Sequence, residues 1–415
     1  MAKKQKKVAP EPALTKHQLS KWQRQMRIRR IVIIATAVFL AGIAGWVGYG
    51  YYNDYKTNPS HEVVIEVNGV HFNMQYYINT IDAYANLYGL NYTDFYYYGN
   101  QIADTVADNI INAELLRQAA ANLNITVTTA EINTALQQYG LPKDSKYQDI
   151  MRASLLEQKV KDYFGAQLPA TMEQADMQVV LVESQEVANE VITKIEAGSN
   201  FTALVDEFSC NSSIEGNLGW LPEELMPNTL IANAAFNLTP GDISQPIYDK
   251  TAIKDVGYWL IKVTAKQGGA INASVMLLGS EAQAEQVKAQ LAAGGNFSAL
   301  AEEYSQYASN TTDGELDGLK PGDMKSVAFD AVAFNLLLNQ VSDPVKDTSV
   351  HTTGGYWLVN VVDRADRQLS DSVKQQLIGN HYNDWLGNWS KQSTINTYLD
   401  PAKKQYAINQ ALAGM

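Results

Sequence analysis

The pattern of hydrophobic and polar positions repeats itself in the second half of the chain. The segment GYWLIKV (Gly257–Val263) returns as GYWLVNV (Gly355–Val361), 98 residues further on. Upstream, AAFNLTPGDISQPI (Ala234–Ile247) aligns with VAFNLLLNQVSDPV (Val332–Val345) at the same spacing. Self-similarity at a fixed spacing indicates a repeated structural unit. We therefore predict two modules of about 95 residues each, an ordinary size for a small domain.

Each copy shows the same order of local patterns. It opens with a short apolar run, Met177–Val182 in the first copy and Ser274–Leu278 in the second, which is typical of a buried strand. In the first copy Val187, Val191 and Ile195 then recur every four residues, the spacing of one helix face. A short second helix, a polar loop and two strand-like runs follow. This order predicts an α+β module built around a small sheet.

The regions on either side of the repeats have mostly helical patterns. Residues 60–170 begin with a strand and a turn, His61–Gly69, and continue as helices. Residues 369–415 contain further amphipathic helices, whose apolar faces need a partner. We predict that they pack on the N-terminal helical region, with the repeats inserted between the two. The many tyrosines between Tyr76 and Tyr98 fit either ordinary helix packing or an exposed substrate surface.

The first 52 residues have the composition of a membrane anchor. Residues 1–30 carry ten Lys and Arg against one acid, and residues 31–52 contain no charge. About twenty apolar residues span a bilayer, and a basic flank favours the cytoplasmic side. We predict a cytoplasmic tail, one transmembrane helix in the lipid bilayer, and an extracytoplasmic body. The alternative is a signal peptide cleaved after Ala44, although the apolar run exceeds the usual length of a signal-peptide core.

Charge and composition exclude several classes of function. The net charge is −12, and because the first 30 residues contribute +9, the remainder carries −21. An acidic body argues against nucleic acid as a partner. Cys210 is the only cysteine in the sequence, so no intramolecular disulfide forms, and the five histidines lack metal-ligand spacing. We therefore expect no cofactor and no metal.

The joint motif of the repeats resembles the parvulin (PpiC-type) family of peptidyl-prolyl isomerases. The motif runs G-x-N-F-x-x-L-x-x-x-x-S, G-x-L-G-W, A-F-x-L-x-x-G-x-I-S-x-P-I and G-Y-x-L-I-K-V, from Gly198 to Val263 in the first copy. The resemblance implies two tandem modules, residues 171–266 and 270–364, each with a four-stranded antiparallel sheet. The flanks are similar to SurA-type chaperones, in which a C-terminal helix completes a helical region that begins with a V-N-G turn, here Val67–Gly69.

The resemblance also implies a polar network beneath a proline-binding groove. Family members usually have a histidine in the first strand, another in the last strand, and a cysteine or aspartate after a conserved serine. The matching positions are Val179, Asn211 and Trp259 in the first copy and Val275, Tyr307 and Trp357 in the second. Cys210 lies one residue out of register, and we interpret it as an incidental small residue rather than a catalytic one. Because every polar member is replaced, we predict little or no isomerase activity.

The apolar lining of the groove is better preserved. The matching positions are Met226, Ile231 and Phe236 in the first copy and Met324, Phe329 and Phe334 in the second. Methionine adapts to varied apolar ligands, whereas phenylalanine in such a pattern is often core. We predict a membrane-anchored chaperone that binds unfolded or emerging secreted polypeptides. Two alternatives stay open: an isomerase that works without histidines, and a structural subunit of a membrane complex.

Overall fold

The computed structural model describes residues 36, 38–49, 58–211, 216–307 and 313–413. The chain divides into two compact units. The first combines the residues up to Tyr163 with those from Tyr382 onward, and the second runs from Phe164 to His381. Of the predicted transmembrane helix, residues 31–52, the structure describes residues 36 and 38–49, and the others lie outside the described residues. Within the ranges that are described, no helix combines the length and the apolar character needed to cross a membrane.

The first unit is a helical body with a three-stranded antiparallel sheet of order β11-β1-β2. Two of its helices, α5 (Ser145–Gln167) and α12 (Asp371–Lys391), contribute residues to both units. The other elements are η1 (Pro59–His61), β1 (Val63–Val67), β2 (Val70–Asn73), α2 (Met74–Tyr88), α3 (Tyr92–Asn122), α4 (Thr129–Gln138), β11 (Ile395–Thr397) and α13 (Pro401–Ala413).

Capping residues in the sequence explain where these helices begin and end. Asn91 and Thr128 each form a capping box with an acidic side chain three residues later, at the starts of α3 and α4. Gly89 ends α2 with a φ of +63°, a left-handed conformation that glycine adopts without a Cβ penalty. The boundaries of the N-terminal helices therefore follow from local chemistry.

The C-terminal segment completes the first unit, as predicted. Ala407, Ile408 and Ala411 of α13 are buried in one core with side chains from β1, α2 and α3. The V-N-G turn at the end of β1 also binds the C-terminal segment through hydrogen bonds. The backbone N of Asn68 donates to the carbonyl of Thr394 (2.8 Å), and the backbone N of Thr394 donates to Asn68 Oδ1 (2.7 Å). The turn therefore joins the two ends of the chain's described body.

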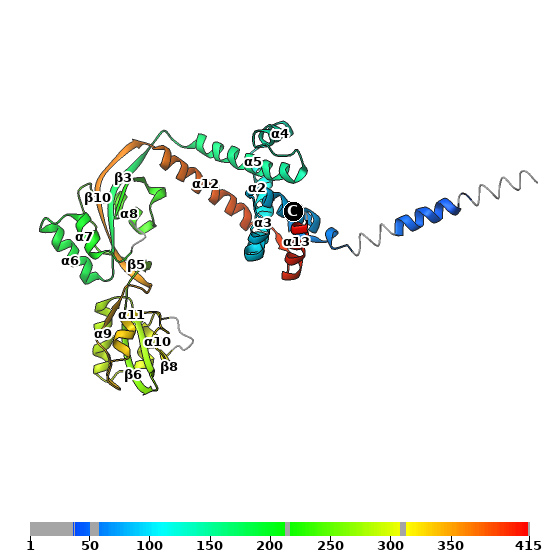
Figure 1. Ribbon diagram of the computed structural model, residues 1–415. Helices are drawn as coiled ribbons and strands as arrows, with labels where there is room; N and C mark the ends of the chain where they lie inside the picture. The colour runs from blue at the N-terminus through cyan, green and yellow to red at the C-terminus, as the bar shows by residue number, and fades with distance from the viewer. Residues whose placement is uncertain (1–35, 37, 50–57, 212–215, 308–312, 414–415) are drawn as a thin grey trace, which may run out of the picture. The chain divides into compact units, whose positions relative to one another are not determined.

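The second unit contains two four-stranded antiparallel sheets, each with its own helices (Figure 1). The elements that precede the second GYWL segment are β3 (Thr171–Val182), α6 (Gln185–Glu196), α7 (Phe201–Phe208), β4 (Asn217–Pro222), η2 (Glu223–Leu225), α8 (Thr229–Asn237), β5 (Ile247–Lys254), β6 (Gly257–Gln267), β7 (Ala270–Leu278), α9 (Glu281–Ala292), α10 (Phe297–Tyr304), β8 (Glu315–Leu319), α11 (Val327–Ala333) and β9 (Val345–Asp347). The last strand is β10 (Thr352–Gln368).

The two sheets are not built from the two repeats in chain order. The first sheet has the order β4-β3-β10-β5 and the second has the order β8-β7-β6-β9. Each repeat therefore gives its GYWL strand to the sheet of the other repeat. We call residues 171–254 with 352–368 module 1, and residues 257–347 module 2. The tandem arrangement predicted for the folded modules is wrong, because module 2 is inserted into module 1.

A two-residue turn explains this exchange. β6 and β7 are joined by Gly268 and Gly269, whose φ angles are +60° and +86°. Positive φ at both central positions is characteristic of the type I′ hairpin turn. The turn folds Gln267 back to pair with Ala270. The last strand of the first repeat consequently pairs with the first strand of the second repeat, and β10 is left to complete module 1.

A serine at equivalent positions of the two repeats, Ser244 and Ser342, binds each exchanged strand through a hydrogen bond. Ser244 Oγ accepts a hydrogen bond from the backbone N of Val359 (2.9 Å), and Ser342 Oγ accepts one from the backbone N of Ile261 (3.0 Å). In each module the serine precedes the edge strand, and its partner lies on the exchanged strand. The exchange therefore keeps the same contacts in both modules, with the two copies of the strand interchanged.

Candidate functional site

The strand exchange regroups the predicted site residues. Trp357 shares a hydrophobic cluster with Val179 of module 1, whereas Trp259 shares one with Val275 and Tyr307 of module 2. The sequence-based groups had each tryptophan in the opposite module. The predicted grouping of Trp259 with Val179 and of Trp357 with Val275 is wrong, because the last strands are exchanged between the modules.

Each tryptophan donates one hydrogen bond to a buried aspartate of its own sheet. Trp357 Nε1 lies 3.0 Å from Asp249 Oδ2, and Trp259 Nε1 lies 2.9 Å from Asp347 Oδ2. The two indoles are 3% and 2% exposed. The aspartates are 98 residues apart in the sequence, as the tryptophans are. The repeat therefore carries a Trp–Asp pair in the place where the family resemblance implies histidine.

Other donors occupy the second oxygen of each carboxylate. Asp249 Oδ1 accepts from the backbone N (2.8 Å) and Oγ1 (2.7 Å) of Thr251. Asp347 Oδ1 accepts from the backbone N (2.8 Å) and Oγ (2.6 Å) of Ser349, and its Oδ2 also accepts from Ser326 Oγ. Burial alone would raise the pKa of both aspartates, but these hydrogen bonds outweigh it and lower each pKa. Each aspartate is held as a charged internal acceptor, which suits a structural role.

Asn211 and Tyr307 take different parts in the two modules. Asn211 Nδ2 donates to the carbonyl of Ile253 at 2.8 Å. The Tyr307 ring packs edge-on against Trp259, with 5.1 Å between ring centroids, and its hydroxyl lies 3.4 Å from the sulfur of Met324. Asn211 therefore joins a loop to β5, and Tyr307 covers the indole of module 2.

Cys210 is held in a form that is unsuited to nucleophilic chemistry. Its Sγ donates to the carbonyl of Leu181 at 3.1 Å, and burial raises its pKa to about 12. A thiol with this pKa stays protonated at neutral pH, and the thiolate is the reactive species. Its geometry agrees with the interpretation of Cys210 as an incidental small residue.

Burial separates the six predicted groove positions into two classes. Ile231 and Phe329 are both 0% exposed, and the Phe329 ring packs 5.3 Å from the Trp259 ring. These two side chains are core, so the prediction that they line a groove is wrong. The other four are half-buried at the margins of the same clusters: Met226, Phe236, Met324 and Phe334.

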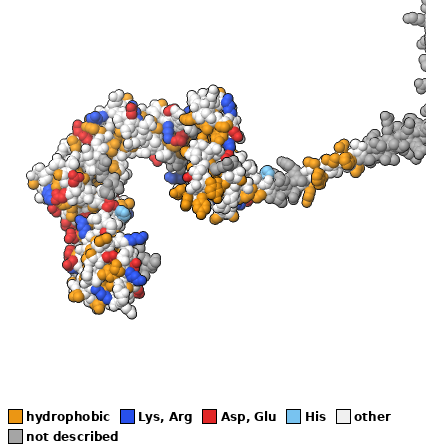
Figure 2. Space-filling model, viewed as in Figure 1, with side chains coloured by type: hydrophobic (Ala, Val, Ile, Leu, Met, Phe, Trp, Pro, Cys, Tyr) orange, Lys and Arg blue, Asp and Glu red, His pale blue; other side chains and the backbone are white. Residues whose placement is uncertain are grey.

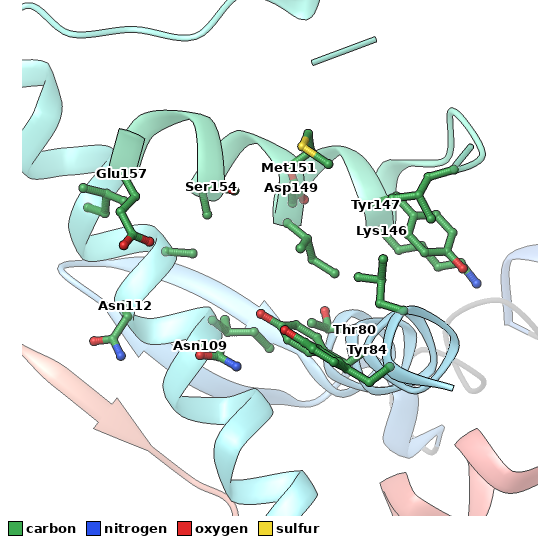
Figure 3. A pocket seen from close by; sticks show the side chains of 18 of the residues that line it. Thr80, Tyr84, Asn109, Asn112, Lys146, Tyr147, Asp149, Met151, Ser154 and Glu157 are labelled. Atoms are coloured by element: carbon green, nitrogen blue, oxygen red, sulfur yellow. The ribbon is translucent and has the colours of Figure 1, made fainter. Parts of the chain in front are cut away.

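The first unit contains a hollow of about 640 Å³ that the sequence patterns do not reveal. Figure 3 shows α5 on one side of it, facing Thr80 and Tyr84 of α2 and Asn109 and Asn112 of α3. Tyr84 stacks on the exposed Tyr88, with 5.8 Å between ring centroids. A concave surface that combines apolar rings with a few amide groups is the usual composition of a ligand site.

Charged side chains around this hollow are largely paired with one another. Lys146 forms an ion pair with Asp82, and Asp149 forms one with Arg152. The Tyr76 hydroxyl donates a hydrogen bond to Asp149 Oδ2 at 3.2 Å. The hollow therefore offers rings and neutral hydrogen-bonding groups more than free charge, which suits an extended polypeptide better than an ionic ligand.

The tyrosine-rich stretch contains both buried and exposed rings, and its interpretation as a substrate surface stays a prediction. Tyr77 is fully buried and its hydroxyl donates to the carbonyl of Ala103 at 2.7 Å. Tyr92, Tyr96 and Tyr97 are about 70% exposed. Within the described ranges, no group of three or more His, Cys, Asp or Glu side chains is arranged to bind a metal ion.

The family comparisons divide the chain in the same order as its repeats. Residues 23–151 match the SurA-like N-terminal domain, and residues 173–265 and 279–363 match the PPIC-type PPIASE domain. Each PPIC-type segment includes the GYWL strand that the fold gives to the other module. This is expected, because the two copies of that strand are nearly interchangeable in sequence.

Chaperone SurA of Dechloromonas aromatica (strain RCB) is 25% identical over 358 residues, which cover 73% of this chain and 78% of that protein. Foldase protein PrsA 3 of Bacillus anthracis is 33% identical over 134 residues, 31% of this chain and 45% of that protein. Among solved structures, foldase protein PrsA of Streptococcus pneumoniae shows 15% identity over 88% of each chain, with a TM-score of 0.27. At that score the structural likeness carries no weight.

Proposed function

Because this chain belongs to the parvulin-type (PPIC) family and joins two such modules to a SurA-like N-terminal domain, we propose that it is a membrane-anchored extracytoplasmic chaperone. Its clients are unfolded or emerging secreted polypeptides. The names of its relatives, chaperone SurA and foldase PrsA, support a function in assisting protein folding. We further propose that its isomerase activity is weak and that it is attached to the membrane.

The observation that carries the proposal is the Trp–Asp pair in each module. Prolyl isomerisation requires lowering a rotation barrier of about 18–20 kcal/mol. An enzyme lowers it only by binding the twisted amide better than the planar one. Trp357 and Trp259 fill the interior with an indole that is already bonded to Asp249 or Asp347. At the positions where the family has histidine, neither module then presents a titratable group to a substrate amide, so we expect binding without efficient catalysis.

The hollow of the first unit is the stronger client site. The deeper apolar positions of the modules, Ile231 and Phe329, are sealed in the core. In the hollow, by contrast, Tyr84 is half-buried and Tyr88 is 69% exposed. Tyrosine supplies a large apolar ring together with a hydroxyl at low entropic cost, and it is enriched among residues that dominate binding energy.

The proposal is tested by measuring two activities on one full-length preparation. We expect the protein to suppress aggregation of a reduced, unfolded secreted protein at near-stoichiometric ratio. In the same buffer it should accelerate isomerisation of an X-Pro tetrapeptide little above the spontaneous rate. Robust isomerase activity would instead favour the alternative of an enzyme that works without histidines. Failure of both measurements would favour a structural subunit.

The site of binding is tested by a matched pair of variants. The double variant Tyr84→Ala/Tyr88→Ala should weaken binding of an unfolded client by about fivefold or more, as loss of a central aromatic contact does. Tyr248→Ala is the control, because Tyr248 is an exposed tyrosine (57%) in module 1. Equal binding by both variants, with unchanged thermal unfolding, would place the client elsewhere.

Anchoring rests on the basic residues 1–30 and the uncharged residues 31–52. These patterns favour a cytoplasmic N-terminus and an extracytoplasmic body. Protease added outside intact cells with a permeable envelope should degrade the body and spare the N-terminal tail. Protection of the body would contradict the proposed topology.

A further inference from the structure

The first turns of α3 expose a cluster of aromatic rings that client binding in the large hollow does not use. We call Tyr92, Tyr96, Tyr97 and Tyr98 the tyrosine surface; they are between 59% and 72% exposed. Phe95 and Gly99, one helical turn apart, face the body instead, where Phe95 is buried and Gly99 lies against Ile408 of α13. The three consecutive tyrosines 96–98 therefore point outward around most of the helix circumference.

The tyrosine surface adjoins a second hollow of about 520 Å³ between α3 and α13. Figure 2 shows hydrophobic side chains gathered on the part of the first unit where these two helices lie. Amide groups complete the lining: Asn100, Gln101, Gln405 and Asn409. Of the described residues that line this hollow, none carries a charge. The surface thus combines apolar rings with neutral hydrogen-bonding groups.

Nearby lysines are already paired, which keeps the surface electrically neutral. Lys403 Nζ lies 2.6 Å from Glu62, and Lys404 Nζ lies 2.5 Å from Asp104. Both lysines belong to α13, the helix that also supplies Ile408 to the hollow. Any ligand of this surface is therefore selected by its amphipathic character rather than by a strong charge.

The chain enters its body close to this surface. Glu62 follows four residues after Asn58, where the described body begins, and pairs with Lys403 at the start of α13. From Lys403 to Leu412 at the hollow is nine residues, about 14 Å along a helix. Residues 53–57 connect this point to the uncharged segment 31–52 and span at most about 20 Å. The anchor would therefore hold the tyrosine surface within reach of the bilayer.

We propose that the tyrosine surface rests in the headgroup region of the membrane that anchors the chain, an inference that depends on the proposed anchor. Tyrosine is enriched at membrane–water interfaces because its ring is apolar and its hydroxyl binds water and lipid headgroups. A helix surface of this kind sits about 5–10 Å into the headgroup and acyl boundary. Since the surface is neutral, its contact does not require anionic lipid. The contact would orient the client-binding unit relative to the membrane.

The experiment uses the full chain with Cys210→Ser, reconstituted in phosphatidylcholine vesicles. One preparation carries Tyr97→Cys and the other carries Tyr139→Cys, each labelled with the same polarity-sensitive thiol fluorophore. Tyr139 is the matched control, because it is a tyrosine of the same unit with similar exposure (72% against 70%). Quenching is then measured with lipids that carry a spin label near the headgroup, at low and high salt.

We expect at least about twofold stronger quenching at position 97 than at position 139, at both salt concentrations, as interfacial insertion without charge predicts. Equal quenching in a chain that floats with the vesicles would overturn the membrane contact and leave the anchor intact. A chain that does not float would overturn the anchor and this contact with it. A fluorescence change at position 97 with unfolded polypeptide, but not with spin-labelled lipid, would make the surface a client site and also overturn the inference.

Discussion

Module 1 and module 2 contain the same sheet order and the same Trp–Asp pair, but the chain builds them differently. Module 2 is continuous, because all four of its strands lie between Gly257 and Asp347. Module 1 has three strands before the insertion and receives its central strand, β10, only afterwards. A strand in the middle of a sheet supplies hydrogen bonds to two neighbours. The sheet of module 1 is therefore complete only when the segment that follows module 2 in the chain has joined it.

The comparison also shows that each repeat supplies a strand to the module formed mainly by the other repeat. The strand GYWLVNV supplies Trp357 to Asp249, which lies in the other repeat, and GYWLIKV supplies Trp259 to Asp347 in the same crossed manner. Both copies offer the same tryptophan at the same place, so the Trp–Asp hydrogen bond does not by itself select the pairing. The short turn at Gly268 and Gly269 decides which pairing forms.

The largest expected effect is on isolated fragments. Residues 256–350 should fold cooperatively, because they contain every strand of module 2 and its core. Residues 171–266, which follow the repeat boundary, should not fold as a stable monomer, because they lack β10. Near-UV circular dichroism and urea unfolding distinguish the two. A cooperative, monomeric fragment 171–266 would show that β6 can replace β10. The strand exchange would then not be required for module 1 to fold.

The next largest effect should be the loss of unfolding free energy when the buried phenylalanine of module 2 is truncated. Phe329→Ala should destabilise the module by about 3–5 kcal/mol, because the ring is fully buried against Trp259. Phe334→Ala is the matched control at a half-buried position and should cost clearly less. Denaturant unfolding of the fragment 256–350 measures both. Similar losses would mean that the two rings are not divided into core and margin as described.

Removal of the indole donors should have a smaller effect that differs between the modules. Trp357→Phe leaves Asp249 Oδ2 with a distant contact to Asn228 Nδ2 (3.5 Å), whereas Trp259→Phe leaves Asp347 Oδ2 bonded to Ser326 Oγ. An unsatisfied buried acceptor costs about 1–3 kcal/mol. We therefore expect the larger loss of unfolding free energy for Trp357→Phe. The opposite order would indicate that cavity formation, rather than the hydrogen bond, determines the cost.

The smallest expected effect is a dependence of stability on acid. Hydrogen bonds outweigh burial and lower the folded pKa of both Asp249 and Asp347. Each therefore stabilises its module above the unfolded pKa of about 3.9, and this contribution is lost as the pH falls through the lower folded pKa. Unfolding free energies of Asp249→Asn and the parent chain, measured from pH 7 down to pH 3, should converge. A gap that widens in acid would contradict the assignment.

Local patterns in the sequence were sufficient to predict the repeated α+β modules and the N-terminal body completed by C-terminal helices. They also indicated Trp259 and Trp357 as candidate site positions, which stays a prediction. The strand exchange was missed, although the Gly268-Gly269 turn between two strand-like runs is a direct hairpin signal. The aspartates were missed too, although Asp249 and Asp347 repeat at the same spacing of 98 residues.

Other features depend on packing that a local pattern does not contain. Phe329 and Phe334 occupy similar apolar positions in the sequence, yet only Phe329 is fully enclosed. The hollow of about 640 Å³ in the first unit forms where α2, α3 and α5 meet, so no single segment of the sequence indicates it. Tertiary contacts, rather than residue type, separate core from accessible surface at these places.

The strand exchange is tested most directly by engineered disulfides in a Cys210→Ser background. Gln178 pairs with Asn360 across β3 and β10, and their side chains hydrogen bond at 3.0 Å. Lys262 occupies the same place in the other GYWL strand and instead pairs with Ser274. Direct partners in an antiparallel pair lie about 4.5–5.5 Å apart at Cα, within the range of a disulfide.

Under mild oxidation of the monomer, Gln178→Cys/Asn360→Cys should form a disulfide in high yield, and Gln178→Cys/Lys262→Cys should stay reduced. Free thiols are counted by mass spectrometry after alkylation. Disulfide formation in the Gln178→Cys/Lys262→Cys variant, with free thiols in the other, would show that the modules follow one another along the chain and would contradict the nested arrangement.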